Sequence, residues 1–118
     1  MTTVRRTNLI LAAIAALLSI SLPAAADFTT IAEAYELALC DVRVPATPSS
    51  GISFKTCDDC DMQLVRVTPN TQYNFNGKTY TLKEFRKRVF NIQDRSQTFV
   101  SVVHHLEADV VLSVSVFE

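Results

Sequence analysis

The spacing of apolar side chains predicts a helix at the start of the chain's more polar part. Thr30-Ile31-Ala32-Glu33 has the form of a capping box, in which two polar side chains satisfy free N–H groups at a helix start. Apolar residues then recur on one helical face at Ile31, Ala34, Tyr35, Ala38 and Val42. Because Pro45 disfavours helix at the residue before it, we expect an N-terminal helix within residues 27–44.

The next stretch predicts a linker and a hairpin. Residues 45–51 contain two prolines, two serines and a glycine, a composition typical of a linker. Ile52–Thr56 and Met62–Thr68 have the composition of strands, and Cys57-Asp58-Asp59-Cys60-Asp61 lies between them. A second hairpin is predicted at Asn76-Gly77, because both residues tolerate the positive φ of a tight turn.

A second capping box, Thr81-Leu82-Lys83-Glu84, opens another predicted helix. Leu82, Phe85 and Val89 share one side of it, and it closes near Phe90 or Asn91.

Two strands rich in β-branched residues follow, Thr98–His105 and Asp109–Phe117. Alternation in the second predicts a core face formed by Val110, Leu112, Val114 and Val116. The order of elements predicts one α+β domain over residues 27–118, with a small antiparallel sheet of about four to six strands and two helices packed on one face. The strands and the second helix occupy residues 52–118.

Residues 1–26 have the layout of a secretory signal peptide. Arg5 and Arg6 precede the apolar run Leu9–Ile20, and Ala24-Ala25-Ala26 offers a cleavage site before Asp27. Pro23 interrupts the run short of the roughly 20 residues that a membrane span needs. We therefore expect cleavage after Ala26, a periplasmic or secreted protein, and no transmembrane segment after cleavage.

The charge of the expected mature chain argues against nucleic-acid binding. Without the leader, nine basic and twelve acidic residues remain of the 118-residue chain, a formal charge of −3. A net negative protein lacks the sequence-independent attraction to phosphate backbones on which such binding depends.

Three cysteines, Cys40, Cys57 and Cys60, are expected in an oxidising compartment. If Asp58-Asp59 is a two-residue turn, Cys57 and Cys60 lie opposite each other at about 5.5 Å between Cα atoms, within disulfide range. Loop entropy instead favours Cys40–Cys60 by roughly 1.5 kcal/mol. We expect Cys57–Cys60, with Cys40 free or paired between chains.

Two other roles for the cysteines stay open. A redox-active Cys-x-x-Cys needs a positive field at the sulfur, whereas Asp58, Asp59 and Asp61 surround this one. Cys57 and Cys60 also have the spacing of half a zinc site. A zinc or copper site would add Cys40 and one of His104 and His105, because neighbours on a strand point to opposite faces. Outside that alternative, we expect no cofactor.

The densest charge lies on the second predicted helix, at Lys83, Arg86, Lys87 and Arg88. Such cations complement the negative C-terminal end of a helix dipole on a solvated face. We expect that solvated face first; the alternative is a patch for an anionic partner, such as lipid A phosphates, acidic phospholipid headgroups or an acidic protein.

Tyr73–Val116 resembles the periplasmic domain of the ExbD/TolR biopolymer-transport family. The shared features are a strand reaching Asn76-Gly77, then Thr81-Leu82-Lys83-Glu84-Phe85 opening a helix, then two β-branched strands. The resemblance implies a periplasmic domain. It assigns no functional residue, because the family's membrane helix carries an aspartate and Leu9–Leu22 has no acid.

No catalytic triad, phosphate loop or nucleotide fingerprint occurs in the chain. We therefore expect a small exported binding or assembly module, stabilised by a disulfide, that meets an unknown protein or envelope component. The alternative is a thiol-redox or metal-binding protein that uses Cys57, Cys60 and His104 or His105.

Overall fold

The structure is a computed structural model that describes residues 30–118. The predicted signal peptide and its cleavage site lie outside these residues. The described part consists of the following elements: β1 (Ala32–Ala38), the 3₁₀ turn η1 (Leu39–Asp41), β2 (Val42–Arg43), β3 (Gly51–Phe54), β4 (Gln63–Arg66), β5 (Gln72–Phe75), β6 (Lys78–Tyr80), α2 (Leu82–Phe90), β7 (Phe99–His105) and β8 (Val110–Phe117).

The predicted N-terminal helix is wrong: its residues form β1, η1 and β2. All seven residues of β1 pair antiparallel with β7, from Ala32 opposite His105 to Ala38 opposite Phe99. Tyr35 and Leu37 face the core, whereas Glu36 is exposed. Alanine has a high helix propensity, and it is also small enough to lie on either face of a strand. The same stretch therefore fits both the spacing of a helix and the alternation of a strand. Pairing with β7 decides between them.

The predicted fold class is also wrong. The strands form one eight-stranded mixed sheet, and within residues 30–118 only α2 is an α-helix. The sheet runs β1-β7-β8-β4-β3-β2, with β5 beside β8 and β6 beside β5. Both β4 and β5 run parallel to β8. The two extra strands that replace the first helix, β1 and β2, and the two parallel contacts of β8 account for the difference from a small antiparallel sheet.

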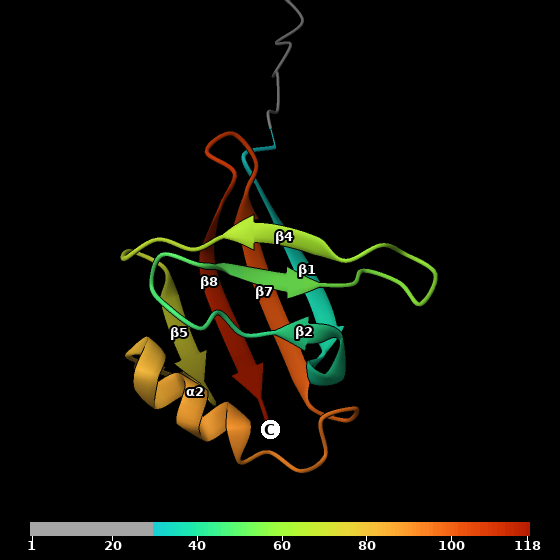
Figure 1. Cartoon of the computed structure of the whole chain (residues 1–118), viewed down its shortest axis with the longest axis vertical. Coiled ribbons are helices and arrows are strands. Elements are labelled where there is room, and N and C mark those ends of the chain that lie inside the picture. Colours follow the sequence, from blue (N-terminus) through green and yellow to red (C-terminus); the bar gives the residue numbers. More distant parts are fainter. Residues whose placement is uncertain (1–29) are drawn as a thin grey trace, which may run out of the picture.

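The sheet folds over on itself at η1. Because β1 leads through this turn into β2, the two ends of the strand path meet at one corner of the chain. Leu39 fills the corner, and its N–H donates to the Thr98 carbonyl at 2.9 Å. Figure 1 shows the result, with β2, β3 and β4 crossing in front of β1, β7 and β8.

The core lies between these two crossing layers. Tyr35 of β1 and Phe54 of β3 meet there with ring centroids 5.1 Å apart. On the side of β5, α2 closes the core with Phe85, whose ring lies 5.3 Å from that of Tyr73. The largest fully buried side chains are Phe54, Phe85, Leu39, Ile52, Val67, Val100, Val102, Val111, Val114, Val116 and Pro45.

The predicted core face of β8 is half right. Val103 pairs with Ser113 and His104 with Val111, so Leu112 is an extra residue in this strand, a β-bulge. The extra residue breaks the alternation of side chains, so the residues before the bulge point to the opposite face from the one predicted. Val114 and Val116 are buried as expected, but Val111 is buried in place of Val110, and Leu112 is 42% exposed.

Three predicted units are confirmed. β3 and β4 form the antiparallel hairpin after a loop at residues 45–50. β5 and β6 form the second hairpin, in which Asn76 and Gly77 have φ of 49° and 83°. α2 begins where the capping box predicted, with the Thr81 hydroxyl accepting from the Glu84 N–H.

Candidate functional site

The disulfide prediction is confirmed. Cys57 and Cys60 are joined, with Cα atoms 5.0 Å apart, in the turn between β3 and β4. The Cys60 N–H also donates to the Cys57 carbonyl at 3.2 Å, which closes the turn through the backbone. Cys40 is free and exposed in η1. The sulfurs therefore stabilise a hairpin end that strands flank on both sides, and no helix begins at the disulfide.

The residues proposed for a metal site lie apart. Cys40 follows the end of β1 that pairs with Phe99, the first residue of β7. His104 and His105 lie at the opposite end of β7. The length of β7 separates these ends by about 20 Å. Among residues 30–118, no group of three His, Cys, Asp or Glu side chains is placed to hold a metal ion. The structure thus does not bring the proposed ligands together.

The two histidines instead hold the β7–β8 turn. His104 Nε2 lies 2.8 Å from Asp109 Oδ1, and Asp109 has a left-handed φ of 53°. His105 Nδ1 accepts from the Ala108 N–H at 3.0 Å. These contacts give both histidines a structural role in the turn.

The basic residues of α2 divide between two sides of the helix. Lys83, Arg86 and Lys87 line a groove between α2 and the loop at residues 45–50. Arg88 lies on another side, with its guanidinium 4.2 Å from the centre of the Tyr80 ring, which Lys78 also approaches at 5.5 Å. Three of the four predicted patch residues thus share one surface.

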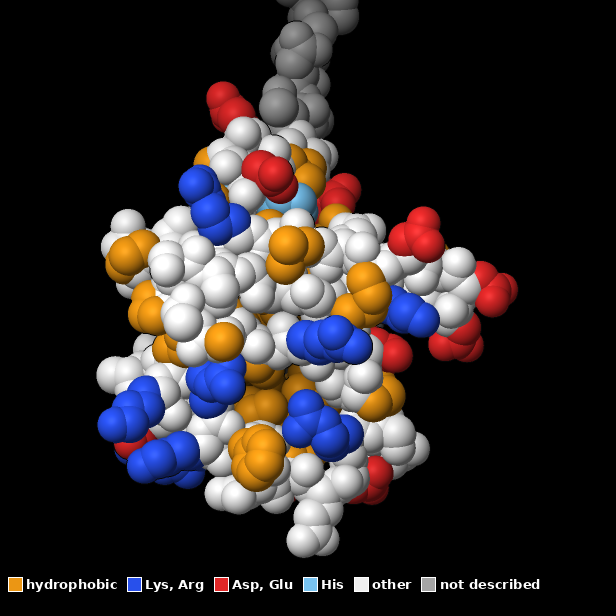
Figure 2. Space-filling view, viewed as in Figure 1, with side chains coloured by type: hydrophobic (Ala, Val, Ile, Leu, Met, Phe, Trp, Pro, Cys, Tyr) orange, Lys and Arg blue, Asp and Glu red, His pale blue; other side chains and the backbone are white. Residues whose placement is uncertain are grey.

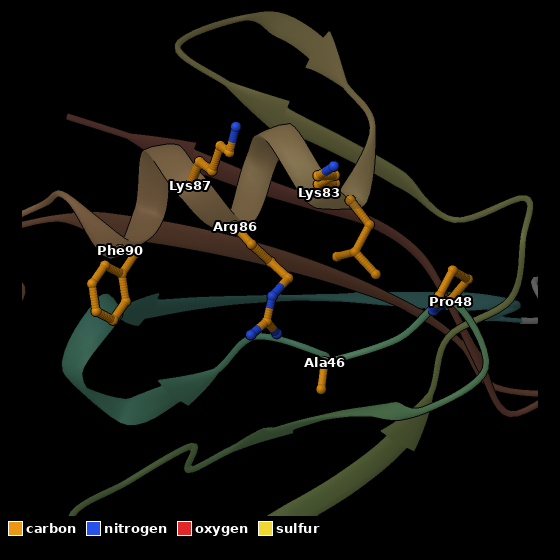
Figure 3. Close-up of a pocket in the computed structure, with 7 residues that line it drawn as sticks. Ala46, Pro48, Lys83, Arg86, Lys87 and Phe90 are labelled. Carbon is orange, nitrogen blue, oxygen red and sulfur yellow. The ribbon is translucent and has the colours of Figure 1, made fainter.

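That groove has a volume of about 460 Å³, within the size range of small-molecule sites. Positions 83, 86, 87 and 90 share one face of α2 because they follow helical spacing. Ala46 and Pro48 form the opposite wall, and Leu82 lies at the helix start. Figure 3 shows Arg86 pointing from α2 to the loop, with Phe90 on the same side of the helix but separated from Ala46 and Pro48 by Arg86, and Lys87 pointing away from the loop.

A direct hydrogen bond joins the two walls. Arg86 Nη1 donates to the carbonyl of Pro45, a fully buried residue at the base of the loop. The helix side is held in turn by Phe85 and Val89, which are buried in the core. Both walls are therefore fixed to the same core, and Arg86 sets the distance between them.

Apolar surface is exposed in this groove. Phe90 is the most exposed large hydrophobic side chain of the described residues, at 85%. Figure 2 shows apolar atoms in a hollow on the lower half of this face, between Lys and Arg side chains. An exposed apolar surface rimmed by charge is typical of an interaction site.

The charge on the rim has one sign. The Lys87 ammonium lies 3.9 Å from the Glu84 carboxylate. Both side chains are exposed to solvent, so this ion pair contributes little free energy. Lys83 forms no ion pair with any residue in 30–118. A second groove, of about 520 Å³ beside Leu64, carries Arg66 and Asp109 together and so has no charge preference. The α2 groove is the stronger candidate.

The sequence interpretation found the cations of this site and missed its apolar part. The sequence placed Ala46 and Pro48 in a linker. It placed Leu82 on the core side of the helix and Phe90 at the helix end. Phe90 carried the one usable signal, because an aromatic residue seven positions after Lys83 lies on the polar face.

Comparison with known proteins adds no relative. No protein-family model, curated protein or solved structure matches the chain. The resemblance of residues 73–116 to the ExbD/TolR family therefore stays a prediction. No helix within residues 30–118 has the length and apolarity to cross a bilayer.

Proposed function

We propose that this protein is a small exported binding module and that its ligand site is the groove between α2 and the loop at residues 45–50. The ligand carries negative charge and an apolar part. The observation that carries the proposal is Phe90, exposed at 85% on a helix face whose other groove residues are cations. Exposed aromatic surface costs solvation free energy, which a ligand that covers it recovers.

The basic rim supports an anionic ligand. Arg86 crosses the groove, Lys83 and Lys87 lie on its rim, and no acidic residue lines it. Positive charge at the edge of a low-dielectric surface attracts anions more strongly than the same charge in bulk water. Although the whole expected mature chain is negative, this surface is locally positive.

The rest of the fold supports a scaffold role. The disulfide closes a hairpin end, both histidines hold a turn, and η1 fixes the corner of the sheet. Each of these features has a structural role, and η1 leads through β2 to the loop wall of the groove. A binding or assembly role therefore accounts for more of the molecule than catalysis does.

Fluorescence titration with 8-anilinonaphthalene-1-sulfonate, an anionic aromatic probe, tests this proposal. We expect saturable one-to-one binding that weakens about three- to tenfold in Lys83→Gln and in Phe90→Ala. Lys78→Gln is the matched control, because it removes the same charge from a lysine outside the groove. Probe binding that is equal in all four proteins, or no saturable binding, would contradict the proposal.

A further inference from the structure

The backbone of the loop wall disfavours a peptide strand as the ligand. A strand that binds by addition needs a row of free N–H and C=O groups. Pro45 and Pro48 have no N–H, and the Thr47 N–H donates to Ser50 Oγ at 3.1 Å. Three of the four residues at 45–48 therefore cannot donate to a peptide. The Pro45 carbonyl is also taken, because it accepts from Arg86.

The width of the groove disfavours a helix. Arg86 reaches the opposite wall directly, so the two walls stand within one arginine side chain of each other. A helix with its side chains is about 10–12 Å across. Where Arg86 bridges the walls a helix cannot enter between them, and the space suits a ligand about as thin as an extended hydrocarbon chain.

The lining then separates into a place for a charge and a place for a chain. Lys83 and Lys87 lie on the rim, where their ammonium groups stay in water. Leu82, Ala46 and the Phe90 ring offer apolar surface that needs no hydrogen bonds from the ligand. An alkyl chain covers such a surface without leaving polar groups unpaired, which a peptide backbone would do.

We propose that the ligand is a single-chain anionic amphiphile of the fatty-acid class. Its acidic head lies at Lys83 on the rim, and its chain covers Leu82 and Ala46 and then passes over the Arg86 side chain to the Phe90 ring. This inference rests on the proposed function, because it names the ligand class of the same groove. It adds that neither a peptide nor a headgroup without a chain satisfies the site.

Isothermal titration of the purified protein with a series of saturated carboxylates, from hexanoate to dodecanoate and below their micelle concentrations, tests the inference. A fully buried methylene is worth about 0.8 kcal/mol, which is fourfold in affinity. Because the groove is open on one side, we expect about twofold to fourfold tighter binding per added methylene. The neutral alcohol of ten carbons should bind at least threefold more weakly than decanoate.

Three variants assign the effects to the groove. Lys83→Gln should remove most of the preference for decanoate over the alcohol. Phe90→Ala should flatten the dependence on chain length. Because Phe90 is exposed, this variant should fold, and a thermal melt of each variant checks that. Lys78→Gln should behave as the unchanged protein does.

The outcomes separate this inference from the proposed function. If the sulfonate probe binds in the groove but affinity is independent of chain length, the fatty-acid class is wrong and the groove remains a binding site. Tight binding of an acidic apolar peptide with no binding of decanoate would also overturn this inference alone. If neither probe nor carboxylate depends on Lys83 and Phe90, both proposals fail.

Discussion

Tyr73 is the residue at which burial and polarity conflict most directly. Its side chain is 5% exposed, and its hydroxyl is buried without a hydrogen-bond partner among residues 30–118. Burial raises the pKa of the Tyr73 hydroxyl above its usual value of 10.0, because the phenolate would have to lose its water shell. The neutral form is therefore the one that the fold tolerates.

This conflict predicts how stability changes at alkaline pH. A pKa that is higher in the folded state contributes stability that is complete below pH 10 and is lost as pH rises through the folded value, by at most about 1.4 kcal/mol per pH unit. Tyr73→Phe should remove that loss and change the neutral-pH free energy of unfolding by about 0 to 2 kcal/mol toward greater stability. Urea denaturation of both proteins from pH 7 to pH 11 measures this, and a parallel alkaline decline in the two would contradict it.

The bulge in β8 makes a second prediction about single residues. Val114 is fully buried, so Val114→Ala should cost on the order of 1–4 kcal/mol of unfolding free energy, through lost burial and a cavity. Leu112 is 42% exposed as the extra residue of the bulge, so Leu112→Ala should cost less than about 1 kcal/mol. Denaturation midpoints measured side by side check the pair. Equal costs would mean that Leu112 is in the core and the bulge is misplaced.

At the scale of elements, the β3–β4 hairpin shows what the disulfide contributes. The loop that Cys57 and Cys60 close is only four residues long, so the bond removes little entropy from the unfolded chain. The pairing from Gly51–Arg66 to Phe54–Gln63 already sets the hairpin register.

We therefore expect Cys57→Ser/Cys60→Ser to fold and to lose about 0 to 2 kcal/mol, the low end of the usual range for disulfides. Urea unfolding under non-reducing conditions measures the loss, with Cys40→Ser as the control for general effects of removing a cysteine. A double variant that fails to fold would show that the hairpin depends on the bond.

The elements that could be predicted from the sequence are those that nearby residues determine. Asn76-Gly77 sets its own turn, and Thr81 caps α2 through a bond to Glu84. For β1 the local signals were ambiguous, because a capping box and helical spacing competed with alternation. Residues 32–38 become a strand because β7, more than sixty residues later, offers them an edge. The bulge at Leu112 likewise depends on the partner strand. No local pattern in the sequence carries either piece of information.

At the scale of the whole molecule, the candidate site is a product of topology. The cations of α2 could be read from the sequence, and so could the two prolines of the loop. The groove exists because the corner at η1 brings the loop at residues 45–50 opposite a helix that begins more than thirty residues later, where Arg86 meets Pro45. Only the folded chain places an apolar floor beneath those charges.

The measurement that tests the central claim most directly is a map of amide chemical shifts during titration with decanoate, by ¹H–¹⁵N correlation spectroscopy. The account predicts that the largest shifts, saturating together, fall on the groove walls at Ala46, Lys83, Arg86, Lys87 and Phe90, with little change at Leu64 and Arg66 in the second groove. Shifts centred on the second groove, or small shifts spread over the molecule without saturation, would contradict it.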